Sequence, residues 1–341
     1  MQVEILSTPD PACDAFVRRM PEHKICHLPA WSDMVVQALG HRPFYLVARE
    51  GTDIQGVLPL MLVRSRLFGV RMISQAFHSY GGPLVESHDA LDILYNRAVE
   101  LATEHGCETI EFRNIKPLPY KLYLRTDKVA MYLPLKSNPD ELWCSFKGEI
   151  RNRVRKAEKS GIIVIRGRME LLDDFYRMWT VRMRQLGTPS YPRMLMYQLL
   201  ETFPDNSWIF LVRLGGLAVG GGLTTCFNGF ADMQWVATLT KYNKLAPNTL
   251  LYWSVIKYHC LTGALCFDFG RSTVGGSTYE FKKRWGSEPV ELPYQYWVHP
   301  DKEFSPVVPN NPKYKKKVEA WKKLPLWMTR LIGPYISRNL P

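Results

Sequence analysis

One order of elements occurs twice along this chain: three strands joined by tight turns, a loop, a long helix and a final strand. The first copy spans residues 43–115 and the second spans residues 208–270. In both copies, β-prone segments are separated by glycine-containing turns and lead to one apolar helix. No obvious residue-level repeat accompanies the pattern, so the duplication is one of element order. It predicts an α+β protein with two similar units and mixed, mainly antiparallel sheets.

The length of 341 residues and the position of a Pro-rich segment indicate where these units divide. Compact domains commonly contain about 150 residues, and residues 133–142 are typical of a joint between the two copies. We therefore expect a first domain over residues 1–140, a second domain over 141–300 that carries the reactive site, and a tail over 301–341.

Composition narrows the class of protein. Hydrophobic residues make up 46% of the chain, yet no apolar run approaches the roughly twenty residues that span a bilayer. The N-terminus lacks the basic start and apolar stretch of a secretion signal, so we expect a cytoplasmic protein. The seven cysteines are scattered without a CxxC pair, as buried apolar side chains would be. His23 and His27 have no nearby third ligand, so neither a metal nor another cofactor is expected.

The formal net charge of +12 predicts a polyanionic partner, such as nucleic acid, a phosphorylated carrier, a nucleotide-linked sugar or an acidic membrane surface. Two segments hold much of this charge. Residues 147–168 contain eight Lys or Arg against two Glu, and residues 313–330 contain seven against one. The partner is therefore expected to contact two separate basic regions.

The first basic segment predicts a helix over residues 147–161. Lys147, Arg151, Arg155 and Lys159 fall in one row at i, i+4 spacing. Like charges at this spacing repel by about 0.2–0.5 kcal/mol per pair, which favours an anion bound by Arg151 and Arg155. A solvated helix face is the alternative interpretation.

The second basic segment predicts an amphipathic helix with Val318, Trp321 and Leu324 on one face. Pro325 breaks this helix, and a second apolar segment with Trp327 and Tyr335 follows. Such an end suits an anionic leaflet, where each Lys near the surface contributes about 1 kcal/mol, so peripheral contact with the inner membrane face is one interpretation. Packing of the tail on the first domain is the other.

The densest group of polar and cationic side chains lies in CFDFGRSTVGGSTYEFKKRWG, residues 266–286. A short apolar strand runs into Gly270, which permits a sharp bend, and a glycine pair at 275–276 lets backbone amides approach a ligand closely. The basic side chains from Arg271 to Arg284 are opposed only by Glu280, so the segment favours an anionic or oxyanion-forming ligand. A solvated loop and a surface helix form the alternative interpretation.

This segment fits transfer of an acyl group to an amine. An activated donor needs an amine aligned with it and a stabilised tetrahedral oxyanion, and no catalytic triad is required. Lys282 is the candidate for that stabilisation, and Arg271 is the candidate for positioning a phosphate or carboxylate. Asp268 is either the base that takes a proton from the attacking ammonium or a turn cap. Three aromatic side chains are candidates for lining the site or for the core: Tyr279, Phe281 and Trp235.

Three loops provide further candidates. The loop 240–248 precedes a helix whose N-terminal amides suit donor phosphates, and Asn248 is the candidate cap of that helix. The loop lacks the Gly-rich signature of coenzyme A users. The loop 184–192 is either an acceptor-side loop, with Thr188 and Tyr191 as contacts, or a Pro-rich connection. In the first copy, Tyr80 of the tight loop 79–84 is a further candidate for substrate contact.

Four short motifs carry a resemblance to a known family: GTP at 187–189, APN at 246–248, FDFGRS at 267–272 and YEFKKRWG at 279–286. Over nearly its full length the chain resembles the FemAB family of peptidyl or aminoacyl transferases. More narrowly, it resembles FemAB-like proteins associated with exopolysaccharide and exosortase gene clusters. The resemblance implies two acetyltransferase-like (GNAT-type) domains that transfer an acyl or aminoacyl group to an amine.

The resemblance also implies roles for particular residues. In the family, the Phe-Lys step of the last helix lies at the transfer site, which points to Phe281 and Lys282 here. Family members often carry an Asp-Pro after a strand of the first half, whereas this chain has EFRNIKP at 111–117, so no role for that carboxylate carries over. The implied donor is aminoacyl-tRNA or an acyl thioester. The implied acceptor is a phosphorylated or lipid-linked amine of a cell-envelope or exopolysaccharide precursor.

Two other functions remain open from the residues alone. One is an N-acyltransferase that takes its acyl group from coenzyme A or an acyl-carrier protein. The other is a non-catalytic module that binds RNA or another polyanion through the two basic segments.

Overall fold

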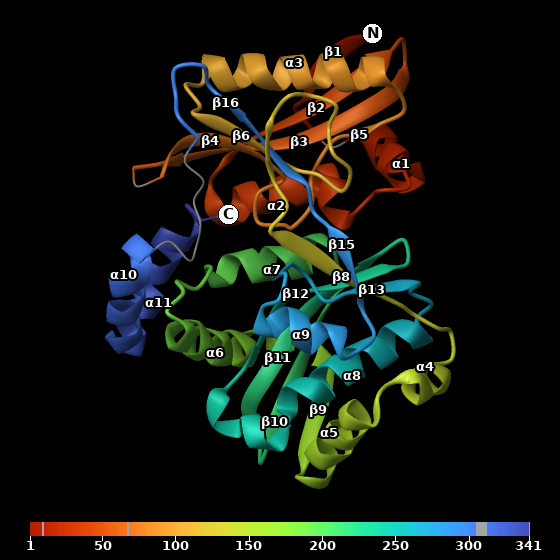
Figure 1. Cartoon of the computed structure of the whole chain (residues 1–341), viewed down its shortest axis with the longest axis vertical. Coiled ribbons are helices and arrows are strands. Elements are labelled where there is room, and N and C mark those ends of the chain that lie inside the picture. Colours follow the sequence, from red (N-terminus) through yellow and green to blue (C-terminus); the bar gives the residue numbers. More distant parts are fainter. Residues whose placement is uncertain (9, 67, 305–311, 341) are drawn as a thin grey trace. The chain divides into compact units, whose positions relative to one another are not determined.

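A computed structural model describes residues 1–8, 10–66, 68–304 and 312–340, with the backbone alone for residues 312–314. Residues 305–311 and 341 of the expected tail lie outside the described residues. The chain divides into two compact units (Figure 1). The first comprises Met1–Lys128, Glu291–Val308 and Asn339–Pro341, and the second comprises Val129–Val290 and Pro309–Arg338.

The first unit is built on a mixed sheet whose described pairs are antiparallel, except for the parallel pair β4–β6. Its strands follow the order β1 (Gln2–Leu6), β2 (Arg42–Glu50), β3 (Asp53–Ser65), β4 (Gly69–Ser74), β6 (Thr109–Arg113), β16 (Tyr294–Val298) and β7 (Tyr123–Arg125), with β5 (Leu84–Val85) beside β3. The three strands, helix and strand expected between residues 43 and 115 are confirmed.

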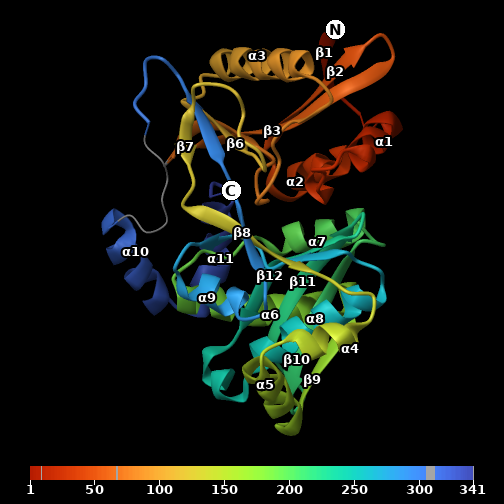
Figure 2. The same ribbon diagram turned by 45° about the vertical axis from the view of Figure 1, so that its right-hand side comes forward.

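Helices cover both faces of this sheet (Figure 2). Helix α3 (His88–Glu104) packs on one face, where alternate β2 residues such as Phe44 and Leu46 enter the core. Helices α1 (Pro11–Arg19) and α2 (Pro29–Leu39), joined through the short helix η1 (Ile25–His27), lie on the other face. There the Tyr45 hydroxyl donates to the carbonyl oxygen of His27 at 2.6 Å. Because both faces are covered, most of β2 and β3 is buried.

The second unit repeats this plan. Its strands follow the order β9 (Ile162–Gly167), β10 (Ser207–Leu214), β11 (Leu217–Phe227), β12 (Phe230–Thr238), β13 (Cys266–Asp268), β8 (Lys128–Pro134) and β14 (Ser272–Thr273), with β15 (Glu288–Glu291) beside β8. Strands β12 and β13 are parallel, as β4 and β6 are in the first unit. The second copy of the expected strand and helix pattern is therefore confirmed as well.

Two layers of helices enclose the second sheet. Helices α4 (Pro139–Ser145), α5 (Gly148–Lys159) and α8 (Pro247–Leu261) share one core with residues such as Phe210 and Val212. Helices α6 (Met169–Leu186) and α7 (Arg193–Thr202) pack on β10, with α6 also reaching β11 and β12. At Gly221 a Cβ atom would lie 2.9 Å from Phe175 of α6, so glycine allows the helix to approach the strand closely.

Each sheet is completed by a strand from the neighbouring half of the sequence. Strand β8 follows the first copy of the pattern but pairs with β13 of the second unit. Strand β16 follows the second copy but pairs with β6 of the first unit. Residues 291–300, expected in the second domain, thus lie in the first unit, and residues 129–140, expected in the first domain, lie in the second.

Among the described residues of the tail, 312–338 belong to the second unit, whereas 301–304 and 339–340 belong to the first. Helix α10 (Pro312–Lys323) and helix α11 (Leu326–Ser337) both pack on α6 of the second unit. Arg330 Nε donates to Thr180 Oγ1 at 3.0 Å, and Ser337 Oγ donates to the carbonyl oxygen of Ser190 at 3.0 Å. Small side chains on one face of α11 permit this close contact, which sequence periodicity did not indicate.

Candidate active site

The candidate site begins where β12 and β13 part. The parallel ladder joins Phe230–Asp232 to Cys266–Asp268, and β13 then ends while β12 continues to Thr238. Gly270 follows with φ of 78°, a conformation that favours glycine, and β14 then pairs with the edge of β8 that faces away from β13. In β12 the register against β11 shifts between Met233 and Trp235, which makes a bulge beside the opening.

Lys282 lies at this opening, on helix α9 (Ser277–Lys283). Its side chain is buried, and Nζ donates to the carbonyl oxygens of Gly270 at 2.8 Å and Arg271 at 3.2 Å. An ammonium group has three N–H donors, so one remains for a reacting oxygen. Burial lowers the pKa of Lys282 to about 8, because Asp268 only partly offsets desolvation and Arg271 adds to the lowering. The Lys282 ammonium is therefore held against the turn that follows β13, with one N–H not used in these two bonds.

Asp268 ends β13 and is 1% exposed. Its Oδ1 accepts a hydrogen bond from the backbone N–H of Gly270 at 2.8 Å. This is the turn-capping geometry, so the structure supports the cap among the two interpretations of Asp268. The carboxylate also favours the charged form of Lys282. Its hydrogen bond thus shapes the turn, and its negative charge favours protonated Lys282.

An aromatic cluster packs against α9. Phe281 is half-buried, with its ring centroid 5.4 Å from that of Tyr252 on α8. Trp285, just after α9, is 1% exposed and meets Phe146 edge to face at 5.2 Å. The ring of Tyr252 is tilted by 32° to that of Phe269, with the centroids 5.1 Å apart, and burial together with the nearby Asp268 carboxylate raises the pKa of Tyr252. Sequence reasoning missed Tyr252 and Trp285 as parts of this site.

A buried polar cluster lies on β11, β12 and α8. Asp232 pairs in register with Asp268 at the last rung of the ladder, and its Oδ1 accepts from Thr225 Oγ1 at 2.6 Å. His259 Nε2 lies 2.9 Å from Thr224 Oγ1, and burial lowers the pKa of His259 to about 4. The imidazole is therefore neutral at physiological pH. This cluster fixes the strands at the base of the opening.

The remaining aromatic and loop candidates occupy different positions. Tyr279 is half-buried on the first turn of α9, beneath the Lys283 ammonium at 5.9 Å. Trp235 is 6% exposed on β12, and its ring centroid lies 6.3 Å from that of Tyr191. Thr188 is exposed in the loop 184–192, which also holds Tyr191. The tail helices contact this loop at Gly187 and Ser190, so the tail fixes its position.

Asn248 is not the cap of α8. Ala246, with φ of 57°, precedes the helix, Pro247 takes the first helical position, and Asn248 is the second residue. The amides of Thr249 and Leu250 donate to the Ala246 carbonyl oxygen at 3.1 and 3.3 Å. These two amides are therefore engaged within the turn, which weakens the expected phosphate site at this terminus.

The basic row lies close to the end of α9. Helix α5 confirms the helix expected over residues 147–161, with Arg151 half-buried and Arg155 exposed, its guanidinium carbon 5.8 Å from the Trp143 ring centroid. Glu149 on α5 pairs with Arg284, the residue after α9, at 3.2 Å. Arg271 is exposed at the edge of the opening. The second unit therefore brings two separately expected cationic regions together.

Tyr80 belongs to the first unit, whereas the other expected site residues belong to the second. It is 1% exposed, with its ring beneath the Lys24 ammonium at 5.6 Å. Such burial within the unit's own core gives a substrate no access to the ring. The expectation that Tyr80 contacts substrate therefore has no support in the position of this side chain.

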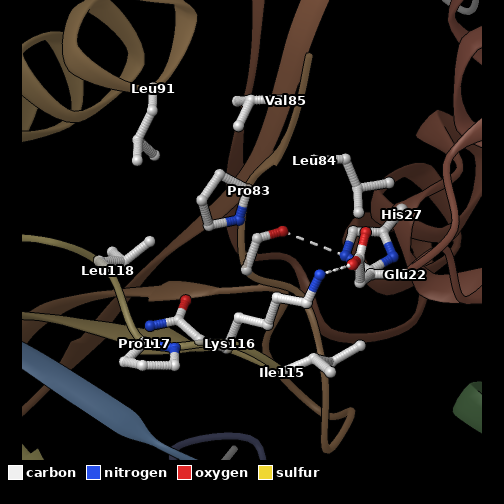
Figure 3. A pocket seen from close by; sticks show the side chains of 12 residues that line it. Glu22, His27, Pro83, Leu84, Val85, Leu91, Ile115, Lys116, Pro117 and Leu118 are labelled. Atoms are coloured by element: carbon white, nitrogen blue, oxygen red, sulfur yellow. Dashed lines mark hydrogen bonds and ion pairs between the residues drawn. The ribbon is translucent and has the colours of Figure 1, made fainter. Parts of the chain in front are cut away.

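The first unit has a pocket of about 200 Å³ near Tyr80's loop (Figure 3). Its walls are mostly aliphatic, its rim carries the Glu22–Lys116 ion pair, and Asn114 lines it. Gln295 Oε1 accepts from the Leu118 amide at 2.6 Å and from Asn114 Nδ2 at 3.0 Å. Asn114 Oδ1 consequently points away from that bond and accepts none from the described residues.

Part of the chain that carries this site matches a known family. Residues 145–283, which hold β9 to β13 and α9, match the family model of the Acetyltransferase (GNAT) domain. This match supports an acyl or aminoacyl transferase rather than a non-catalytic polyanion-binding module. A search of the curated proteins returned no match.

Solved structures share the fold of this chain over both units. FemX is 17% identical, with a TM-score of 0.68 over 88% of this chain and 98% of that one. L-PGS from Bacillus licheniformis is 13% identical, with a TM-score of 0.55 over 97% and 98%. A tandem GNAT protein from the clavulanic acid biosynthesis pathway is 14% identical, with a TM-score of 0.52 over 88% and 100%. The fold is therefore a tandem of GNAT-like domains.

Among the described residues, no helix combines the length and the apolar character needed to cross a bilayer. No group of three or more His, Cys, Asp or Glu side chains in the same part of the chain is placed to hold a metal ion.

Proposed function

We propose that the protein forms an amide bond between an activated acyl or aminoacyl donor and an amine of a phosphorylated or lipid-linked precursor. The precursor belongs to the cell envelope or to an exopolysaccharide, in keeping with the resemblance to the FemAB family. The observation that carries the proposal is the buried Lys282 ammonium, which has one donor left at the opening between β12 and β13.

The reaction begins when the amine nitrogen attacks the donor carbonyl carbon. The carbonyl π electrons move to oxygen, and the resulting oxyanion is stabilised by the Lys282 ammonium. The nitrogen loses a proton to solvent or to Asp268. Collapse of the intermediate then forms the amide and expels a ribose oxygen or a thiolate. Phe281, Tyr279 and Trp235 are proposed to line the substrate side, with Thr188 and Tyr191 toward the acceptor.

A polyanionic donor suits the charge around the opening. Arg151, Arg155 and the exposed Arg271 are proposed to hold its phosphates. The amides of Thr249 and Leu250, which would serve a coenzyme A pyrophosphate, are engaged in their own turn. These features favour aminoacyl-tRNA as the donor, with an acyl thioester of coenzyme A or acyl-carrier protein as the second candidate.

Parallel incubation with three donors tests the proposal. Aminoacyl-tRNA, acyl-coenzyme A and acyl-carrier protein are each mixed with a panel of amine acceptors, and products are identified by mass spectrometry. We expect a new amide from aminoacyl-tRNA, with binding that weakens steeply as salt rises. Amide formation from acyl-coenzyme A alone would assign the second candidate. Absence of an amide with every donor would contradict the proposed reaction.

The pH dependence provides a further prediction. Lys282 stabilises the oxyanion only when protonated, and its pKa is about 8, so transfer should decline as pH rises through about 8. In Asp268→Asn the amide oxygen can still accept the Gly270 N–H, but the negative charge is lost. Because that charge raises the pKa of Lys282, the alkaline decline should move to lower pH. Initial rates across a pH series measure the alkaline decline in the parent and in the variant.

The same variant separates the two roles of Asp268. If this carboxylate were the base, its protonation would lower the rate of the parent at low pH; Asp268→Asn would then lower the rate at every pH and remove that decline at low pH. Asp301→Asn, which changes a carboxylate that is 86% exposed in the first unit, serves as the charge-matched control and should leave the profile unchanged. An unshifted alkaline limb in Asp268→Asn would contradict the coupling to Lys282.

A further inference from the structure

Helix α11 presents its large apolar side chains to solvent and its small side chains to the protein. Thr329, Gly333 and Ser337 recur every four residues and are buried. Three large side chains with the same spacing are instead strongly exposed: Trp327 at 66%, Leu331 at 60% and Tyr335 at 67%. Residues four apart lie on one face of a helix, so these three form a continuous outward stripe.

The inner face holds this stripe in place. Gly333 lies so close to Ser190 that a Cβ atom would be 3.2 Å from its N and Oγ atoms. Arg330 also donates to the Arg177 carbonyl oxygen of α6 at 3.3 Å. The helix is therefore anchored by specific contacts, and its exposed stripe is a fixed feature of the surface. Isolated exposed apolar residues are common, whereas an ordered stripe of this size calls for a partner.

The charge beside the stripe indicates the nature of that partner. Residues 312–338 contain eight Lys or Arg and a single acidic residue, Glu319. Lys315, Lys316, Lys317 and Lys323 of α10 are exposed. A second copy of this chain would bring the same positive charges together and would be repelled. An anionic bilayer has an apolar interior beneath negatively charged headgroups. It therefore matches both the apolar stripe and the lysines.

We propose that α11 lies flat on an anionic lipid bilayer, with Trp327, Leu331 and Tyr335 inserted at the level of the headgroups. The lysines of α10 then contact lipid phosphates. Trp and Tyr are the side chains that favour this interface, because their rings are apolar while one polar group remains hydrated. The proposal concerns where the enzyme works and is independent of which donor or amine it uses.

Vesicle co-sedimentation tests this surface. The full chain is mixed with vesicles of phosphatidylglycerol and phosphatidylcholine, or of phosphatidylcholine alone. We expect sedimentation with the anionic vesicles, release as salt rises, and a blue shift of Trp fluorescence that is absent in Trp327→Phe. The triple variant Trp327→Ser, Leu331→Ser, Tyr335→Ser should lose at least about tenfold in partitioning. Its exposed positions leave the fold intact, which circular dichroism verifies.

A matched control replaces equally exposed apolar residues elsewhere in the second unit. Leu217 and Leu261 are 62% and 64% exposed, and Leu217→Ser, Leu261→Ser should bind vesicles as the parent does. The proposal is overturned if the parent fails to sediment with anionic vesicles, or if the triple variant binds them equally well. A dimer that forms without lipid and is abolished by the triple variant would assign the stripe to a second copy. Transfer to a water-soluble amine is measured alongside, so failure of membrane binding is distinguishable from failure of the proposed reaction.

Discussion

Lys282→Ala should lower kcat/KM for transfer by about 100- to 1000-fold, the cost of losing one oxyanion-stabilising donor. The variant removes the ammonium whose third N–H is available at the opening between β12 and β13. It also leaves the carbonyl oxygens of Gly270 and Arg271 without this donor, which costs about 1–3 kcal/mol of folding stability where such a group is buried. Steady-state kinetics and urea unfolding measure the two effects separately.

Lys283→Ala is the matched control for this variant. Lys283 is the next residue of α9 and carries the same charge, but it is exposed and its ammonium lies over the Tyr279 ring. Loss of this charge should change donor affinity modestly and leave kcat in place. Lys282→Ala that folds and still transfers at the parental rate would refute the assigned role. Equal losses in both variants would indicate that general positive charge, rather than the Lys282 ammonium, supports transfer.

Local patterns were sufficient to predict most elements of both units. Strands such as β11 and helices such as α5 are specified by their own periodicity and by glycine-rich turns. The pairing of β8 with β13 and of β16 with β6 could not be predicted in this way. A strand's sequence favours an extended conformation but does not select its partner, because pairing depends on chain closure over long separations.

The site shows the same division between local and long-range information. Lys282, Asp268 and Phe281 could be identified because glycines and charges mark a single continuous segment. Tyr252 could not, since α8 is apolar on all faces and its periodicity singles out no residue. The cap at Asn248 was wrong because Pro247 begins the helix one residue earlier. The tail's position depends on small residues of α11 meeting Ser190, a contact between segments far apart in sequence.

The position of Lys282 depends on how α9 is held. The helix is short, spanning Ser277–Lys283, and most of its surface is exposed. Short helices have little stability of their own, so tertiary contacts must fix the orientation of this one. Trp285 supplies such contacts, because it lies between Phe146, Phe269 and Phe281, with ring centroids 5.2, 6.0 and 6.4 Å away. It is a positioning residue for the ammonium, not a group that touches substrate.

Trp285→Ala should therefore lower the free energy of unfolding by about 3–5 kcal/mol, the usual cost of truncating a buried Trp. Trp327→Ala truncates a Trp that is 66% exposed and should change the free energy of unfolding by no more than about 0.5 kcal/mol. Urea unfolding measures both. Trp285→Phe should restore much of the stability and transfer, because a second ring fills most of the space and the indole N–H has no hydrogen-bond partner among the described residues. If Trp285→Ala were as stable as the parent and its transfer rate declined over the same alkaline pH range, other contacts would have to position α9.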